Sequence, residues 1–149
     1  MIYFKFFHLL AVLIWIGGMF FAYFVLRLAA VEILQAPERL RLWNSVFRRF
    51  FNWVWGSIGM IFVTGLYMVY QYGGALRVAH SIQAMLLLGI LMACVFVYVF
   101  FACYVPLSLH VDKGRWQEAG EFLGKIRQLV ALNLVLGLLT LSVAKLGLF

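Results

Sequence analysis

Charged side chains are scarce in this chain. Of its 149 residues, 11% are charged and 66% are hydrophobic, whereas soluble domains carry about 25% charged and about 45–50% apolar residues. A fold surrounded by water could not cover so much apolar surface. The composition therefore excludes an ordinary soluble domain and predicts an integral membrane protein.

Cysteine and acidic residues are also few. Cys94 and Cys103 lie in one apolar run, and a regular helix turns by roughly 900° over that separation, which puts the two thiols on opposite faces. They can neither cross-link nor chelate a metal together. The five acidic residues all lie between the apolar runs, so no acid–base site for hydrolysis is visible; they are Glu32, Glu38, Asp112, Glu118 and Glu121.

Long uncharged stretches are what the chain does have. They cover residues 6–26, 50–76, 78–111 and 128–144, and a spanning helix needs about 17–25 residues. We therefore predict one transmembrane domain over residues 1–149, with helices at about 3–36, 50–72, 78–109 and 121–147. The first helix is not expected to be a cleaved signal peptide, because its apolar run is too long and Arg27 follows it.

Lysine and arginine predict the orientation. Nine of them lie in the connections between helices one and two and between helices three and four, against three on the opposite side. Such connections stay in the cytoplasm, so both termini should face the outer, periplasmic side of an all-α, up-down-up-down four-helix bundle. The net charge of +7 is then explained by the membrane topology, and no nucleic acid partner is expected.

Two histidines are the first candidates for chemistry. Histidines in membrane spans are costly and usually functional, and His8 and His80 begin the first and third predicted helices at nearly equal depth. These helices are diagonal in such a bundle, so the pair could ligate the iron of one haem b. The alternative is that both rings are interfacial and bond to backbone or lipid headgroups.

Further residues extend the haem hypothesis. Small residues on the face of His8 leave room for a flat macrocycle, and outer cations could pair with its propionates. The predicted cofactor-binding residues are His8, His80, Trp15, Gly18, Arg77, Lys5 and Lys145, with His8 and His80 as metal ligands.

Two polar stripes are predicted to face inward. They comprise Ser57, Thr64 and Gln71 on the second helix, and Asn133, Gly137, Thr140 and Ala144 on the fourth. Such residues could bond a cofactor, the second nitrogen of a histidine or a quinone-like substrate. Interhelical contacts are the favoured interpretation.

Methionines offer a different chemistry. Their thioethers could form a soft path for copper(I), although packing of the interior is the favoured interpretation. The residues concerned are Met19, Met60, Met68, Met85 and Met92.

A family resemblance rests mainly on the first helix. The segment Phe-His-Leu-Leu-Ala-Val-Leu-Ile-Trp-Ile-Gly-Gly-Met, from Phe7 to Met19, resembles the opening helix of small bacterial membrane proteins in the CopD and HemJ superfamily. Its specific part is the spacing of His8, Trp15 and Gly17-Gly18. Residues 37–65 and 127–145 also fit, so the likeness covers nearly the whole chain.

The resemblance implies two activities. Copper-resistance members are associated with copper uptake across the inner membrane, and HemJ-type members are haem-binding protoporphyrinogen oxidases. The first-helix histidine of the HemJ pattern matches His8. Its lysine early in helix three is absent, because residues 80–83 are His-Ser-Ile-Gln. This departure argues against porphyrinogen oxidation.

The leading hypothesis is therefore a haem b protein of the bacterial inner membrane, ligated by His8 and His80, which transfers electrons. A copper transport or tolerance protein, with the histidines and methionines as its ligands, is the alternative, and the porphyrinogen oxidase is the third. A quinone, a porphyrin or a periplasmic redox protein could be the partner besides the lipid bilayer. A homodimer is compatible with the sequence, which leaves the oligomeric state open.

Overall fold

The computed structural model describes residues 1–146, and every regular element among them is a helix. Residue 147, the predicted end of the fourth helix, lies outside the described residues. The elements are α1 (Ile2–Phe21), the π-helical segment η1 (Ala22–Leu26), α2 (Arg27–Ile33), α3 (Ala36–Gln71), α4 (His80–Tyr98), the π-helical segment η2 (Val99–Tyr104), α5 (Val105–Asp112) and α6 (Trp116–Leu146).

These elements form four long rods. The π-helical segments join their neighbours without a break, so α1–η1–α2 runs from Ile2 to Ile33 and α4–η2–α5 from His80 to Asp112. Together with α3 and α6, they are four helices long and apolar enough to cross a membrane. The predicted all-α class is confirmed, and so is the prediction of four helices long and apolar enough to span a membrane.

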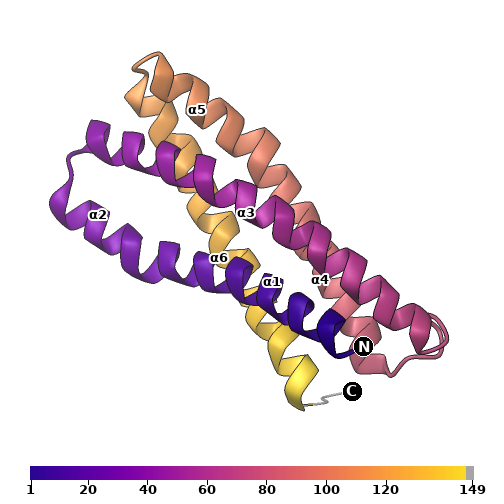
Figure 1. Ribbon diagram of the computed structural model, residues 1–149. Coiled ribbons are helices and arrows are strands. Elements are labelled where there is room, and N and C mark those ends of the chain that lie inside the picture. Colours follow the sequence, from indigo (N-terminus) through magenta and orange to yellow (C-terminus); the bar gives the residue numbers. More distant parts are fainter. Residues whose placement is uncertain (147–149) are drawn as a thin grey trace.

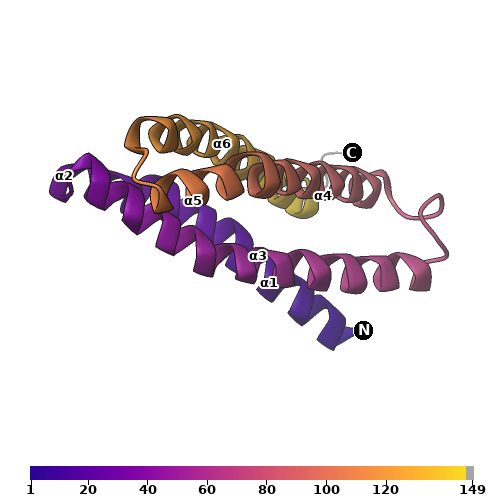
Figure 2. The same ribbon diagram turned by 90° about the horizontal axis from the view of Figure 1, so that it is seen from above.

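The connections lie at two ends of the molecule (Figure 1). The short connection after α2 and the turn at residues 113–115 lie at one end. The loop at residues 72–79 lies at the other, near the N-terminus, and the view from above agrees (Figure 2). We call these the turn end and the N-terminal end. Contacts are most extensive between α1 and α3 and between α4 and α6, and α6 also touches α1 and α3.

The second helix begins at Ala36, earlier than the predicted residue 50. Pro37 lies in its first turn, where proline is well tolerated because its missing N–H would have no partner in the helix. Leu40, Trp43 and Phe47 are buried on one face of the added turns. Arg41, Arg48 and Arg49 are exposed and Arg39 is half-buried, so the charges that interrupt the hydrophobic run do not interrupt the helix.

Aromatic rings fill the middle of the interior. Phe47 and Phe51 stack with ring centres 5.0 Å apart, and the Tyr104 ring meets Phe51 edge-on at 5.2 Å. Phe96 reaches Phe51 at 5.3 Å and Trp15 at 6.4 Å. These contacts join α1, α3, α4 and η2, so this part of the bundle is closely packed.

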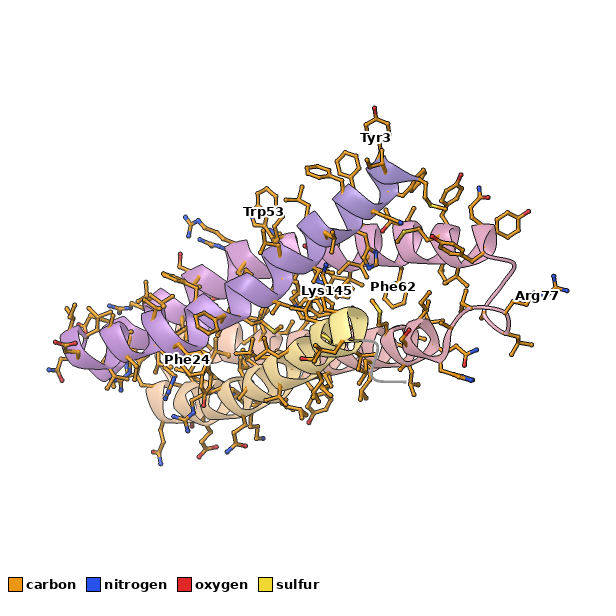
Figure 3. The ribbon with its side chains drawn as sticks, turned by 90° about the horizontal axis from the view of Figure 1, so that it is seen from below. Tyr3, Phe24, Trp53, Phe62, Arg77 and Lys145 are labelled. Carbon is orange, nitrogen blue, oxygen red and sulfur yellow. The ribbon has the colours of Figure 1, made fainter. Side chains whose placement is uncertain are left out.

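The outer surface is apolar. Tyr3 is 74% exposed, Phe24 48% and Trp53 66%, and the side chains of Tyr3 and Trp53 point away from the neighbouring helices (Figure 3). A soluble monomer rarely exposes apolar surface of this extent. A hydrocarbon environment around the helices accounts for it.

Substitution of two adjacent glycines on α1 would test how closely α1 packs against α3. A Cβ atom at Gly18 would lie 2.2 Å from Cε2 of Phe50, whereas a Cβ at Gly17 would meet nothing within 4 Å. Gly18→Ala should therefore lower the unfolding temperature in detergent relative to Gly17→Ala, because overpacking costs about 1–3 kcal/mol. Equal unfolding temperatures in circular dichroism would contradict this close approach.

Candidate functional site

A cavity of about 390 Å³ lies between α1, α3, α4 and α6. It occupies the N-terminal end of the bundle, beyond the aromatic interior. Most of its wall is apolar, and its basic side chains are Lys5 and His8. Three methionines, Met68, Met85 and Met92, also line it. The cavity thus brings together one imidazole and several thioethers.

His8 is held by a residue of the facing helix. Its Nδ1 lies 2.9 Å from Oγ1 of Thr64 on α3. The Thr64 hydroxyl donates its own hydrogen to the carbonyl oxygen of Met60, 2.5 Å away, as threonines within helices commonly do. Having only one hydrogen to give, this hydroxyl must accept from His8. The network therefore places the histidine proton on Nδ1.

This bond decides what the other nitrogen can do. When one nitrogen of a neutral imidazole carries the proton, the other holds a lone pair. Nε2 of His8 is then available as an acceptor or as a metal ligand. Metal-binding histidines are typically oriented in this way, by a hydrogen bond from the nitrogen that does not bind the metal.

Gly65 permits the close approach of His8 to α3. A Cβ atom at this position would lie 3.2 Å from Cε1 of the His8 ring, which is tighter than usual van der Waals contact. The sequence analysis did not select Gly65. Gly65 directly follows Thr64, a member of the polar stripe, and this was the only sequence feature that could have indicated a role for it. The sequence does not show that Gly65 and His8, which are far apart in the chain, are in contact.

The methionine thioethers have free lone pairs. The Thr140 hydroxyl lies 3.9 Å from Sδ of Met92, but it is only 2.8 Å from the carbonyl oxygen of Leu136. The shorter, better-aligned bond takes its single hydrogen, so the contact with sulfur is weak. Two further methionines lie outside the cavity wall: Met60 is exposed, and Met19 is buried in the aromatic interior.

His80 lies apart from this cavity. Its side chain is exposed at the first residue of α4, with Nδ1 3.4 Å from Oε1 of Gln83, and it does not line the cavity that contains His8. The structure gives no bis-histidine site. Joint ligation by His8 and His80 therefore stays a prediction from matched depth.

The other predicted cofactor-binding residues are also dispersed. Trp15 lines the cavity, whereas the space beside Gly18 is filled by the Phe50 ring. Arg77 is exposed and points away from the helices (Figure 3). Lys145 is exposed in the last turn of α6. Of the three outer cations, Lys5 is the one that lines the cavity.

Conventional metal-binding clusters are not found in the described part of the chain. No group of three or more His, Cys, Asp or Glu side chains comes together there. Cys94 is exposed and Cys103 buried, in agreement with opposite faces of one helix. The thioethers of Met68, Met85 and Met92 are the soft donors that share the cavity wall with His8.

Comparison with known proteins identifies a family. The family model described as "Copper resistance protein D" matches residues 44–146. This range includes Thr64 and the three methionines of the cavity wall, and it begins after His8. No curated protein matches the chain. No solved structure matches it either.

The histidine tautomer can be measured directly. In the ¹⁵N spectrum of histidine-labelled protein, the His8 signals should show hydrogen on Nδ1 and none on Nε2, and Thr64→Val should shift them toward a mixture of tautomers because the acceptor is lost. Ser57→Ala, which changes another buried hydroxyl of α3, is the control. A wild-type ring with its hydrogen on Nε2 would exclude the arrangement.

Proposed function

We propose that this chain, which belongs to the copper resistance protein D family, binds copper(I) in the cavity beside His8 and moves it through the membrane. The family match and the four apolar helices identify a multi-pass membrane protein. One observation carries the assignment of the site: His8, whose Nδ1 contacts Oγ1 of Thr64, lines a cavity together with three methionines.

The donor set selects the ion. Thioether sulfur and neutral imidazole favour copper(I), whereas magnesium and calcium require oxygen ligands. No carboxylate lines the cavity. A set of neutral ligands therefore fits a soft, singly charged ion better than a hard divalent one.

The charge of Lys5 points to the same oxidation state. Its side chain lines the cavity but is exposed, so its ammonium group can stay hydrated at the rim. Repulsion between this group and a bound cation grows in proportion to the charge of the cation. Copper(I) experiences half the repulsion that copper(II) would.

The methionines are spaced along the cavity and define a path for the copper ion. Met85 and Met92 are separated by two turns of α4, or about 10 Å along its axis, and both line the cavity together with Met68. A copper(I) ion that leaves Nε2 of His8 can thus pass between weak thioether ligands. Such ligands bind strongly enough to accept the ion and weakly enough to release it.

The orientation in the membrane completes the proposal. With both termini on the periplasmic side of the bacterial inner membrane, as the distribution of lysine and arginine predicts, the cavity would open toward the periplasm and receive copper from there. The up-down-up-down arrangement then places the turn end in the cytoplasm. Copper would move inward.

Copper affinity tests the site. In competition with a chromogenic copper(I) chelator, His8→Ala and Met92→Leu should each weaken binding about tenfold or more, because each removes one ligand bond. His80→Ala and Met60→Leu are the matched controls, since both residues are exposed and lie outside the cavity wall. They should bind like the wild type.

The same preparations separate copper from haem. We expect a protein without a haem spectrum, whether oxidised or reduced with dithionite. A sharp reduced α-band that is lost in both His8→Ala and His80→Ala would contradict the copper proposal and support bis-histidine haem b. Equal loss of copper(I) affinity in the control variants would refute the placement of the site.

Labelling of single cysteines tests the orientation. In a background with Cys94→Ala and Cys103→Ala, we expect Arg77→Cys to react with a membrane-impermeant maleimide on intact spheroplasts. Lys113→Cys should react only after the membrane is permeabilised. Both positions are exposed, so accessibility within the protein does not differ between them. The reverse pattern would invert the proposed topology.

A further inference from the structure

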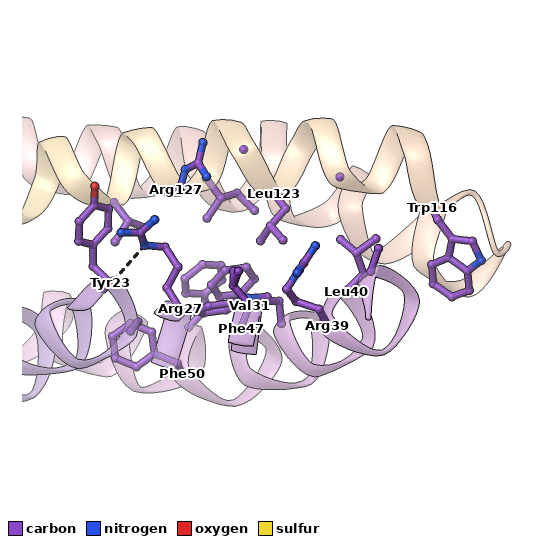
Figure 4. Close-up of a pocket in the computed structure, with 18 residues that line it drawn as sticks. Tyr23, Arg27, Val31, Arg39, Leu40, Phe47, Phe50, Trp116, Leu123 and Arg127 are labelled. Carbon is purple, nitrogen blue, oxygen red and sulfur yellow. Dashed lines mark hydrogen bonds between the residues drawn. The ribbon is translucent and has the colours of Figure 1, made fainter. Parts of the chain in front are cut away.

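A second cavity, of about 330 Å³, lies toward the turn end of the molecule. It is enclosed by η1, α2 and the beginning of α3 on one side and by α6 on the other (Figure 4). Three arginines line it, and they come from three different helices: Arg27 from α2, Arg39 from α3 and Arg127 from α6. None of the 18 lining residues is acidic.

The arginines have few partners among the residues around them. Nε of Arg27 donates to the carbonyl oxygen of Tyr23 at 3.1 Å, and its guanidinium lies 4.5 Å from the centre of the Tyr23 ring. This is the one hydrogen bond marked among the lining residues in Figure 4. The half-buried Arg39 extends from α3 toward α6, Arg127 is exposed on α6, and no hydrogen bond from either to another lining residue is marked (Figure 4).

The rest of the wall is apolar and aromatic. Phe47, Phe50 and Leu123 line the cavity, and Val31, which is 58% exposed, lies at its edge. The cavity thus combines three cationic groups with a hydrocarbon surface that continues onto the outside of the membrane-spanning helices. A ligand that matches it must be anionic at one end and apolar at the other.

We propose that this cavity binds the phosphodiester headgroup of an anionic phospholipid. Guanidinium groups form paired hydrogen bonds with phosphate oxygens, and three cations around one cavity without a carboxylate favour the binding of an anion. The apolar wall receives the beginning of the acyl chains. The cavity lies at the turn end, where the chain leaves the membrane and lipid headgroups are found.

A lipid suits this cavity better than free phosphate does. Inorganic phosphate would satisfy the arginines but leave Phe47, Phe50 and Leu123 in contact with water. A zwitterionic lipid would bring a second cation toward the three arginines. The anionic diester alone matches both the charge and the apolar wall. This site is separate from the copper cavity, and neither proposal depends on the other.

Binding of soluble short-chain lipids tests the proposal. The full chain in a neutral detergent would be titrated with dihexanoyl-phosphatidylglycerol, dihexanoyl-phosphatidylcholine and inorganic phosphate. The readout is tryptophan fluorescence, to which Trp43 and Trp116 in the cavity wall contribute. We expect the phosphatidylglycerol to bind at least about tenfold more tightly than the other two. Arg39→Gln and Arg127→Gln should each weaken it about tenfold, because each removes charge-assisted hydrogen bonds.

Two further variants separate the site from general surface charge. Arg48→Gln removes an exposed arginine of α3 that does not line the cavity, and it should leave binding unchanged. Arg127→Lys keeps the charge, loses the paired geometry and should bind with intermediate strength. Three results would each overturn the proposal: equal binding of inorganic phosphate, equal binding of the phosphatidylcholine, or an equal loss in Arg48→Gln.

Discussion

A polar group among apolar helices must find its hydrogen-bond partner within the protein. The hydrogen bond between His8 and Thr64 satisfies this requirement, which applies to the whole molecule. Thr64 meets this constraint by donating to its own helix and accepting from His8. The imidazole is thereby attached to α3 through Nδ1, and its ring lines the cavity. The close contact between α1 and α3, permitted by Gly65, keeps the two partners within reach.

The interior consists of three regions with different side chains. Aromatic rings from α1, α3, α4 and η2 fill the middle. A cavity with imidazole and thioether ligands lies at the N-terminal end, and a cavity with three arginines lies toward the turn end. One cavity is lined by an imidazole and thioethers, and the other by guanidinium groups. The proposed copper and lipid sites are therefore chemically distinct.

The sequence was sufficient to predict the four helices, since long uncharged runs in a membrane have few other solutions. The inward position of Ser57, Thr64 and Asn133 was predicted correctly, since all three are buried. Gln71, predicted on the same stripe as Ser57 and Thr64, is exposed. The sequence could not reveal what lies opposite a residue. His8 and His80 were predicted to pair because they lie at a similar depth in the membrane. Depth does not determine which face of its helix a residue occupies, and His80 is exposed next to Gln83. Gly18 suggested space for a ligand, and the Phe50 ring of the facing helix fills that space.

X-ray absorption at the copper edge is the most direct test of the account, because it reports the atoms bound to the metal. For protein loaded with one equivalent of copper(I), we predict a first shell of mixed sulfur and imidazole nitrogen, whose nitrogen component is lost in His8→Ala while sulfur remains. A shell without sulfur, or an imidazole component that survives in His8→Ala, would contradict the proposed site.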